Sequence, residues 1–256
     1  MKVILWNLRK SLLELFPTTK YRMILVGLIL IAAFISVSEL LVAKLFTQII
    51  LNEEELAKST LFLLIAFFFI FYGFTRAGQF AQRIYRLRVF DKAFKATDAE
   101  LSMAKDNWRW PLAFELTHIS STLTQMGVVL VFFFYVNWIF ALLDLIMIVI
   151  VLEVIGRLFK KQIEAQRGFV EARKNKAPVA NVVRVGTRIK SGEIGILLSG
   201  FAMIFMLGAL FYFNYIGDIS ASNTVVLFFG LRMQNSNLSG ISTGLMRFAR
   251  ARTHSE

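Results

Sequence analysis

An all-α integral membrane protein is the fold class that the composition, the long apolar segments and the placement of charge predict. Hydrophobic residues make up 57% of the 256 residues and charged residues only 18%, and the mean hydropathy is +0.62. Soluble domains are about a quarter charged. The chain has 26 phenylalanines, three prolines and no cysteine, which favours long lipid-facing helices and excludes disulfides and thiolate sites. At roughly 100–200 residues per domain, we expect one membrane domain.

Three segments are long enough to cross a bilayer, which takes about 20 apolar residues. They cover residues 23–50, 59–80 and 193–215. Residues 1–22 hold only a four-residue apolar run between charges, so this segment lacks the apolar region of a secretory signal.

Residues 119–155 are too long for one span. As a single helix they would measure about 55 Å, nearly twice the ~30 Å hydrocarbon core. The flanking segments 76–126 and 157–190 carry eight and ten Lys or Arg, and basic loops stay in the cytoplasm. The segment between them must therefore cross twice. We predict spans at 119–136 and 139–157, with a tight outer turn at Asn137–Trp138.

The sixth predicted span, residues 223–246, begins apolar and becomes polar after Leu231. Its polar residues recur at intervals of three, four and three, which places them on one helical face, and apolar residues with the same intervals form a neighbouring face. The polar face is Arg232, Asn235, Ser239 and Ser242, and the apolar face is Leu238, Ile241, Leu245 and Phe248.

This topology places 26 of the 29 basic residues on the cytoplasmic side. The outer loops carry Glu53, Glu54, Glu55 and Asp218 instead. Both termini are therefore expected in the cytoplasm, and the net charge of +12 reflects membrane orientation and contact with lipids rather than binding of nucleic acid.

The motifs of common enzymes are missing. The sequence has no GxxxxGK[ST] loop for phosphates, no HExxH and no GxSxG. The two histidines, His118 and His254, are expected to make hydrogen bonds rather than to bind metal. We predict that the chain is not an enzyme and holds no cofactor, so its energy source is a partner or an ion gradient.

Ionisable residues inside spans are costly and are candidates for function. Glu39, Lys44 and Asp144 lie in predicted spans, and either stabilise packing between helices or contribute to a substrate pathway. For Arg232 and its polar face we favour a water-accessible pathway, with Arg232, Asn235, Ser239, Glu39 and Asp144 as its candidate residues.

A second candidate site is Trp108-Arg109-Trp110 in the first cytoplasmic loop. The proline that follows breaks helices, so we expect a compact apolar knuckle. It either rests at the lipid interface or docks a partner protein.

The chain resembles the transmembrane domain of ABC exporters, which has six helices extending into the cytoplasm. The likeness covers nearly the whole chain and rests on the order and spacing of its motifs. They are the segment before the first span (12–22), the pattern Ser-Val-Ser-Glu-Leu-Leu (36–41), the outer turn (135–142), and the sixth span with its linker (231–242 and 248–256).

The resemblance implies an elbow segment over residues 1–22, a membrane domain over 23–250 and a cytoplasmic tail over 251–256. It also implies a homodimer or pseudo-dimer whose twelve helices surround a pathway, in a bacterial inner membrane. ATP and magnesium would bind a separate ATPase chain, docked near Asp106–Ala113 and Ala177–Val185. The docking residues would be Trp108, Arg109, Trp110, Asn181 and Arg184.

Two features depart from that family. The sequence ends at Glu256 without a nucleotide-binding domain, and the second cytoplasmic loop is short. Two alternatives therefore stay open: an exporter-like structural or assembly subunit without an ATPase, and an ion-coupled carrier in which Glu39 or Asp144 takes up a proton. In the transporter hypothesis, Arg232 favours an amphipathic or anionic cargo.

Overall fold

Every regular element that the computed structural model describes is a helix. The described residues are 1–51, 58–96, 103–177 and 179–255, and their side chains are described except at 103–106. The predicted outer residues Glu53–Glu55 and the last residue, Glu256, lie outside this part of the chain. Seven helices are found in it: α1 (Lys2–Leu15), α2 (Thr19–Leu51), α3 (Lys58–Lys95), α4 (Met103–Val136), α5 (Trp138–Lys174), α6 (Asn181–Tyr215) and α7 (Ala221–Ser255).

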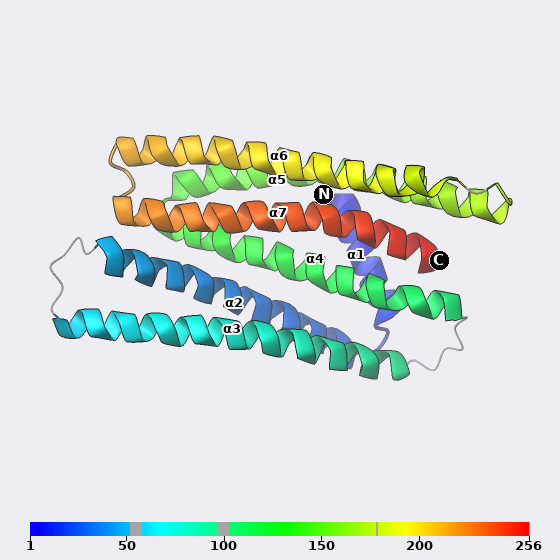
Figure 1. Cartoon of the computed structure of the whole chain (residues 1–256), viewed down its shortest axis with the longest axis horizontal. Helices are drawn as coiled ribbons and strands as arrows, with labels where there is room; N and C mark the ends of the chain where they lie inside the picture. The colour runs from blue at the N-terminus through cyan, green and yellow to red at the C-terminus, as the bar shows by residue number, and fades with distance from the viewer. Residues whose placement is uncertain (52–57, 97–102, 178, 256) are drawn as a thin grey trace.

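Helices α2 to α7 form an elongated bundle in which successive helices alternate in direction (Figure 1). The breaks at Asn137 and at 216–220 lie at one end of the bundle, which we call the hairpin end. The turn after Lys174 lies at the opposite end, and both termini lie in that half of the molecule. The alternation that we predicted from the placement of charge is therefore present.

Five helices, α2 to α6, are long and apolar enough to cross a membrane. Helix α7 does not qualify by its composition, although it is 35 residues long and lies between α4 and α6, its most extensive contacts. Its apolar face is buried as predicted, since Leu238, Ile241, Leu245 and Phe248 are all at most 4% exposed. Packing of this face stabilises α7 despite its polar residues.

The predicted turn between the third and fourth spans is confirmed at Asn137. Its backbone is extended, and its side chain accepts a hydrogen bond of 2.9 Å from the backbone N–H of Phe140, the N-cap arrangement that starts α5. The rings of Phe133 and Phe140 pack across the turn with centroids 5.5 Å apart. One residue is thus enough to reverse the chain.

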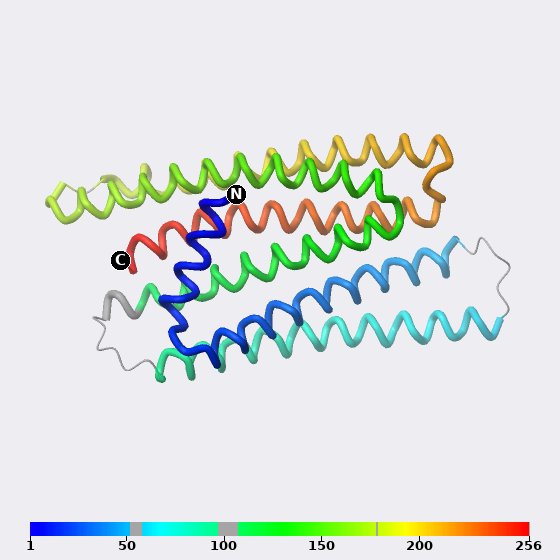
Figure 2. Tube along the Cα trace, turned by 180° about the vertical axis from the view of Figure 1, so that it is seen from behind, coloured from blue at the N-terminus to red at the C-terminus, as the bar shows by residue number. Residues whose placement is uncertain are grey.

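Helix α1 lies across the other helices, packed on α4 and α5 (Figure 2). Its buried residues include Ile4, Leu8 and Leu15. The chain then leaves the helix at Phe16-Pro17, and Arg22 Nε donates to the Phe16 carbonyl at 2.6 Å. Helix α2 therefore begins at Thr19, four residues before the predicted start of the first span.

The prediction of a broken helix at Trp108-Arg109-Trp110 is wrong, because α4 continues through Pro111. Pro111 is exposed, while Leu112 and Ala113 beside it are almost fully buried. A proline loses one backbone hydrogen bond and its ring crowds the preceding turn. Tertiary contacts of the flanking side chains offset that cost here.

Candidate functional site

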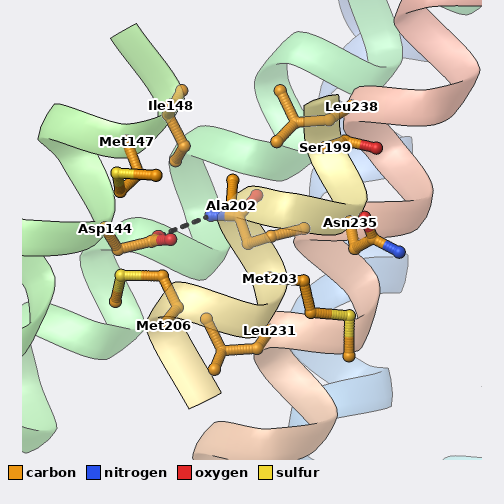
Figure 3. A pocket seen from close by; sticks show the side chains of 11 residues that line it. Asp144, Met147, Ile148, Ser199, Ala202, Met203, Met206, Leu231, Asn235 and Leu238 are labelled. Carbon is orange, nitrogen blue, oxygen red and sulfur yellow. Dashed lines mark hydrogen bonds between the residues drawn. The ribbon is translucent and has the colours of Figure 1, made fainter. Parts of the chain in front are cut away.

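A buried polar contact joins α5 to α7. Asp144 and Gln234 are 3% and 2% exposed. The Gln234 amide donates to Asp144 Oδ2 at 3.3 Å, the dashed line in Figure 3, and to the Met126 carbonyl of α4 at 3.1 Å. The buried Asp144 carboxyl therefore accepts a hydrogen bond from a neutral amide.

Sequence reasoning did not select Gln234 as a site residue. It precedes Leu238, Ile241 and Leu245 by four, seven and eleven positions, so it lies on the apolar face of α7. A polar residue on an otherwise apolar face is a signal that could have identified it, because buried amides require partners.

The predicted polar face of α7 does not form one surface. Ser242 is fully buried and donates to the Gly192 carbonyl of α6 at 3.0 Å. The hydroxyls of Ser239 and Ser199 lie 2.8 Å apart. Arg232, by contrast, is exposed. The four residues span roughly 80° around the helix, and α6 covers the side that holds the serines.

Along α7, Asn235 lies between the exposed Arg232 and the serines that α6 covers. It is half-buried, and its Oδ1 atom is buried without a hydrogen-bond partner in the described part of the chain. Together with Asp144, Ser199 and Gln234 it lines a small pocket between α5, α6 and α7 (Figure 3). The pocket has a volume of about 20 Å³, room for about one water molecule. A single chain thus offers no passage for a larger cargo here.

Glu39 belongs to a separate polar group between α2 and α3. It is half-buried and accepts a hydrogen bond of 2.8 Å from the Gln79 amide, and Arg76 donates to the same Gln79 at 3.1 Å. The nearby hydroxyls of Ser38 and Thr75 are 2.6 Å apart. The structure does not bring Glu39 together with Asp144, since their hydrogen bonds reach different helices.

Two of the candidate docking residues are packed against α3. Arg109 is 9% exposed, and its guanidinium lies 4.6 Å from the centre of the Phe94 ring. Trp110 meets Phe94 edge to face, with centroids 5.3 Å apart. These aromatic contacts explain why the helix tolerates Pro111.

The other three candidate docking residues gather at the end of the bundle opposite the hairpin end. Trp108 of α4 stacks on His254 at 4.6 Å and lies 5.2 Å from the Arg250 guanidinium of α7. Asn181 and Arg184, at the start of α6, line a pocket that Arg250 also lines. Sequence reasoning selected residues on α4 and α6 but missed Arg250 and His254 between them.

The described residues contain no group of three or more His, Asp or Glu side chains placed to hold a metal ion. Searches of protein-family models and of curated proteins found no match to the chain.

Proposed function

We propose that the chain is the membrane subunit of a transporter, with α7 as a sixth span beside α2 to α6. The observation that carries this proposal is the exposed polar edge of α7. Arg232 and Ser236 are exposed there, and Arg232 lies about 16 Å along the helix from Ala221. That is the middle of a ~30 Å hydrocarbon layer, where an arginine against lipid costs several kcal/mol.

The exposed surface of the neighbouring helix α6 is apolar at this depth. On α6 beside this edge, Phe201, Ile204 and Phe205 are 54–67% exposed. Lipid covers such a surface without cost, but it does not cover Arg232. We therefore infer that water or a second copy of the chain faces the polar edge. A homodimer that encloses a pathway between two such edges removes Arg232 from lipid and leaves the apolar surface of α6 in contact with lipid. Arg232 favours an anionic or amphipathic cargo.

The energy source in this proposal is a separate ATPase chain, which would hold ATP and magnesium. It would dock at the end opposite the hairpin end, where α5 and α6 extend beyond the bundle. Because basic residues concentrate there, we place this end and both termini in the cytoplasm, in a bacterial inner membrane. Gentle purification from the native membrane should recover a stoichiometric P-loop ATPase. Recovery with other membrane proteins only would favour an assembly subunit.

The water pathway has a direct test, because the chain has no cysteine and single cysteines can be introduced into the natural sequence. Ser236 and Phe201 lie about 22 and 21 Å from the hairpin ends of α7 and α6, and both are exposed in one chain. In native membranes, a small polar thiol reagent should label Ser236→Cys and not the lipid-facing control Phe201→Cys. An unlabelled Ser236→Cys variant would contradict the pathway.

A second candidate function follows from Asp144. This carboxyl is buried beside a pocket for about one water molecule, and within the described residues it has an amide partner and takes part in no ion pair. Such a group suits a carrier that couples transport to proton uptake. In that case Asp144→Asn should abolish transport driven by a pH gradient, whereas ATP-driven transport should persist.

A further inference from the structure

We propose that Arg184, Arg188 and Arg250 bind a phosphate group at the end of the bundle where α5 turns into α6. The three side chains come from α6 and α7 and line one pocket together with the amides of Gln166 and Asn181. The volume of the pocket is about 40 Å³. Since one water molecule needs roughly 10–15 Å³ by the same measure, the pocket accommodates a group of a few heavy atoms.

The positive charge of this pocket is not balanced by acidic side chains. No carboxylate lines it, and none of the three arginines takes part in an ion pair within the described residues. The Nε atom of Arg184 is buried without a hydrogen-bond partner there. A buried guanidinium donor without a partner is costly, and a bound anion would supply the missing acceptor.

The electrostatics of Arg250 support the same conclusion. Burial, together with the charges of Arg188 and Arg184, lowers the pKa of the Arg250 guanidinium. Burial and nearby arginines, Arg250 first, also lower the pKa of His254. Each group is therefore surrounded by like charge, which an anion would offset.

Packing holds Arg250 in place before any ligand arrives. Its guanidinium lies 5.2 Å from the centre of the Trp108 ring, and Trp108 in turn stacks on His254. An ordered arginine loses less conformational entropy on binding than a free one, and its planar fork matches two oxygens of a phosphate.

The start of α6 adds a smaller contribution. Asn181 is the first residue of this 35-residue helix, and its N-cap, Ala180, offers no side-chain hydrogen bond. The unpaired N–H groups of a helix N-terminus favour an anion. A phosphate fits the combined donors, and it can come from an acidic lipid headgroup or from a free phosphate compound.

The test uses the full chain in detergent, with thermal unfolding as the readout. The ligands are inorganic phosphate, at an ionic strength matched with chloride, and dioctanoyl phosphatidic acid, with dioctanoyl phosphatidylcholine as the neutral reference. We expect the anionic lipid or phosphate to raise Tm. Stabilisation by the lipid alone identifies a headgroup site, and stabilisation by both identifies a site that also accepts free phosphate.

The variant is Arg184→Gln with Arg188→Gln, and the matched control is Lys190→Gln, which removes charge from an exposed position of the same helix. Each lost arginine should raise the half-saturating ligand concentration about tenfold or more, while the control should behave as the wild type. If the double variant fails to fold, Arg250→Lys, which keeps the charge and loses the fork, should still weaken binding severalfold. No stabilisation of the wild type, or equal stabilisation of the arginine variants, would overturn the proposal.

Discussion

At the scale of single residues, the contact between Asp144 and Gln234 shows how the bundle accommodates a carboxyl group away from water. The Gln234 amide donates to the carboxyl and to the backbone carbonyl of Met126, so one side chain connects three helices. The neighbouring pocket offers space for about one water molecule. The pair therefore contributes to packing specificity as well as to any role in transport.

Replacing one member of this pair should cost more than replacing both. We expect Gln234→Leu to lower stability by about 1–3 kcal/mol, because Asp144 then lacks its donor. The double variant Gln234→Leu with Asp144→Leu should recover part of that loss, since both polar groups are removed. Thermal unfolding in detergent measures the three values. A double variant that is less stable than Gln234→Leu would show that the cost of Gln234→Leu does not come from an unpaired Asp144 carboxyl.

The sequence predicted Asp144 as a notable residue but not its partner. Asp144 stands out because apolar residues surround it along its own helix. Its partner depends on which helix packs against that face, and spacing within one helix does not contain this information. For the same reason, the spacing of Arg232, Asn235 and Ser239 predicted a shared face, while α6 covers only part of that face in the folded chain.

At the scale of the elements, the sequence indicates the helix boundaries correctly where chain length or a proline strongly restricts the backbone. The length of residues 119–155 required a reversal, and Asn137 provides it with its own side chain as the cap. Pro17 likewise separates α1 from α2. Pro111 does not interrupt α4, because the contacts of Arg109 and Trp110 with α3 stabilise the helix on its N-terminal side.

The close approach of α6 and α7 depends on Gly195. A Cβ atom at this position would lie 2.0 Å from Ser242 Oγ and 2.7 Å from Ser242 Cβ. We expect Gly195→Ala to push the helices apart and to destabilise the protein by about 1–3 kcal/mol. Gly200→Ala, in the same helix with no atom within 4 Å, should leave stability unchanged or raise it slightly.

Thermal unfolding of both glycine variants in detergent distinguishes packing from helix propensity. A helix-propensity effect alone would stabilise both variants. Equal stability of Gly195→Ala and Gly200→Ala would therefore contradict the close contact between α6 and α7.

At the scale of the whole molecule, a single chain exposes both a large apolar surface and a polar edge, and lipid suits only the apolar surface. Helix α3 leaves a large apolar surface uncovered, with Phe62, Phe74 and Phe80 each at least 67% exposed, as expected for contact with lipid. In the proposed topology, the polar edge of α7 lies at membrane depth on the same molecule. Composition predicted the first property. The second needed the packing of α7, because only that packing determines which of its polar residues stay uncovered.

The two ends of the bundle should lie on opposite sides of the membrane, and basic residues should determine which end faces the cytoplasm. Asp218 is exposed at the hairpin end, and Lys174 and Lys95 are exposed at the opposite end. If basic residues determine the orientation, a membrane-impermeant thiol reagent applied to intact cells should label Asp218→Cys alone. Lys174→Cys and Lys95→Cys should react only after the membrane is opened. Labelling of Lys174→Cys in intact cells would reverse the orientation, and labelling of Asp218→Cys and Lys174→Cys from the same side would contradict a bundle that spans the membrane lengthwise.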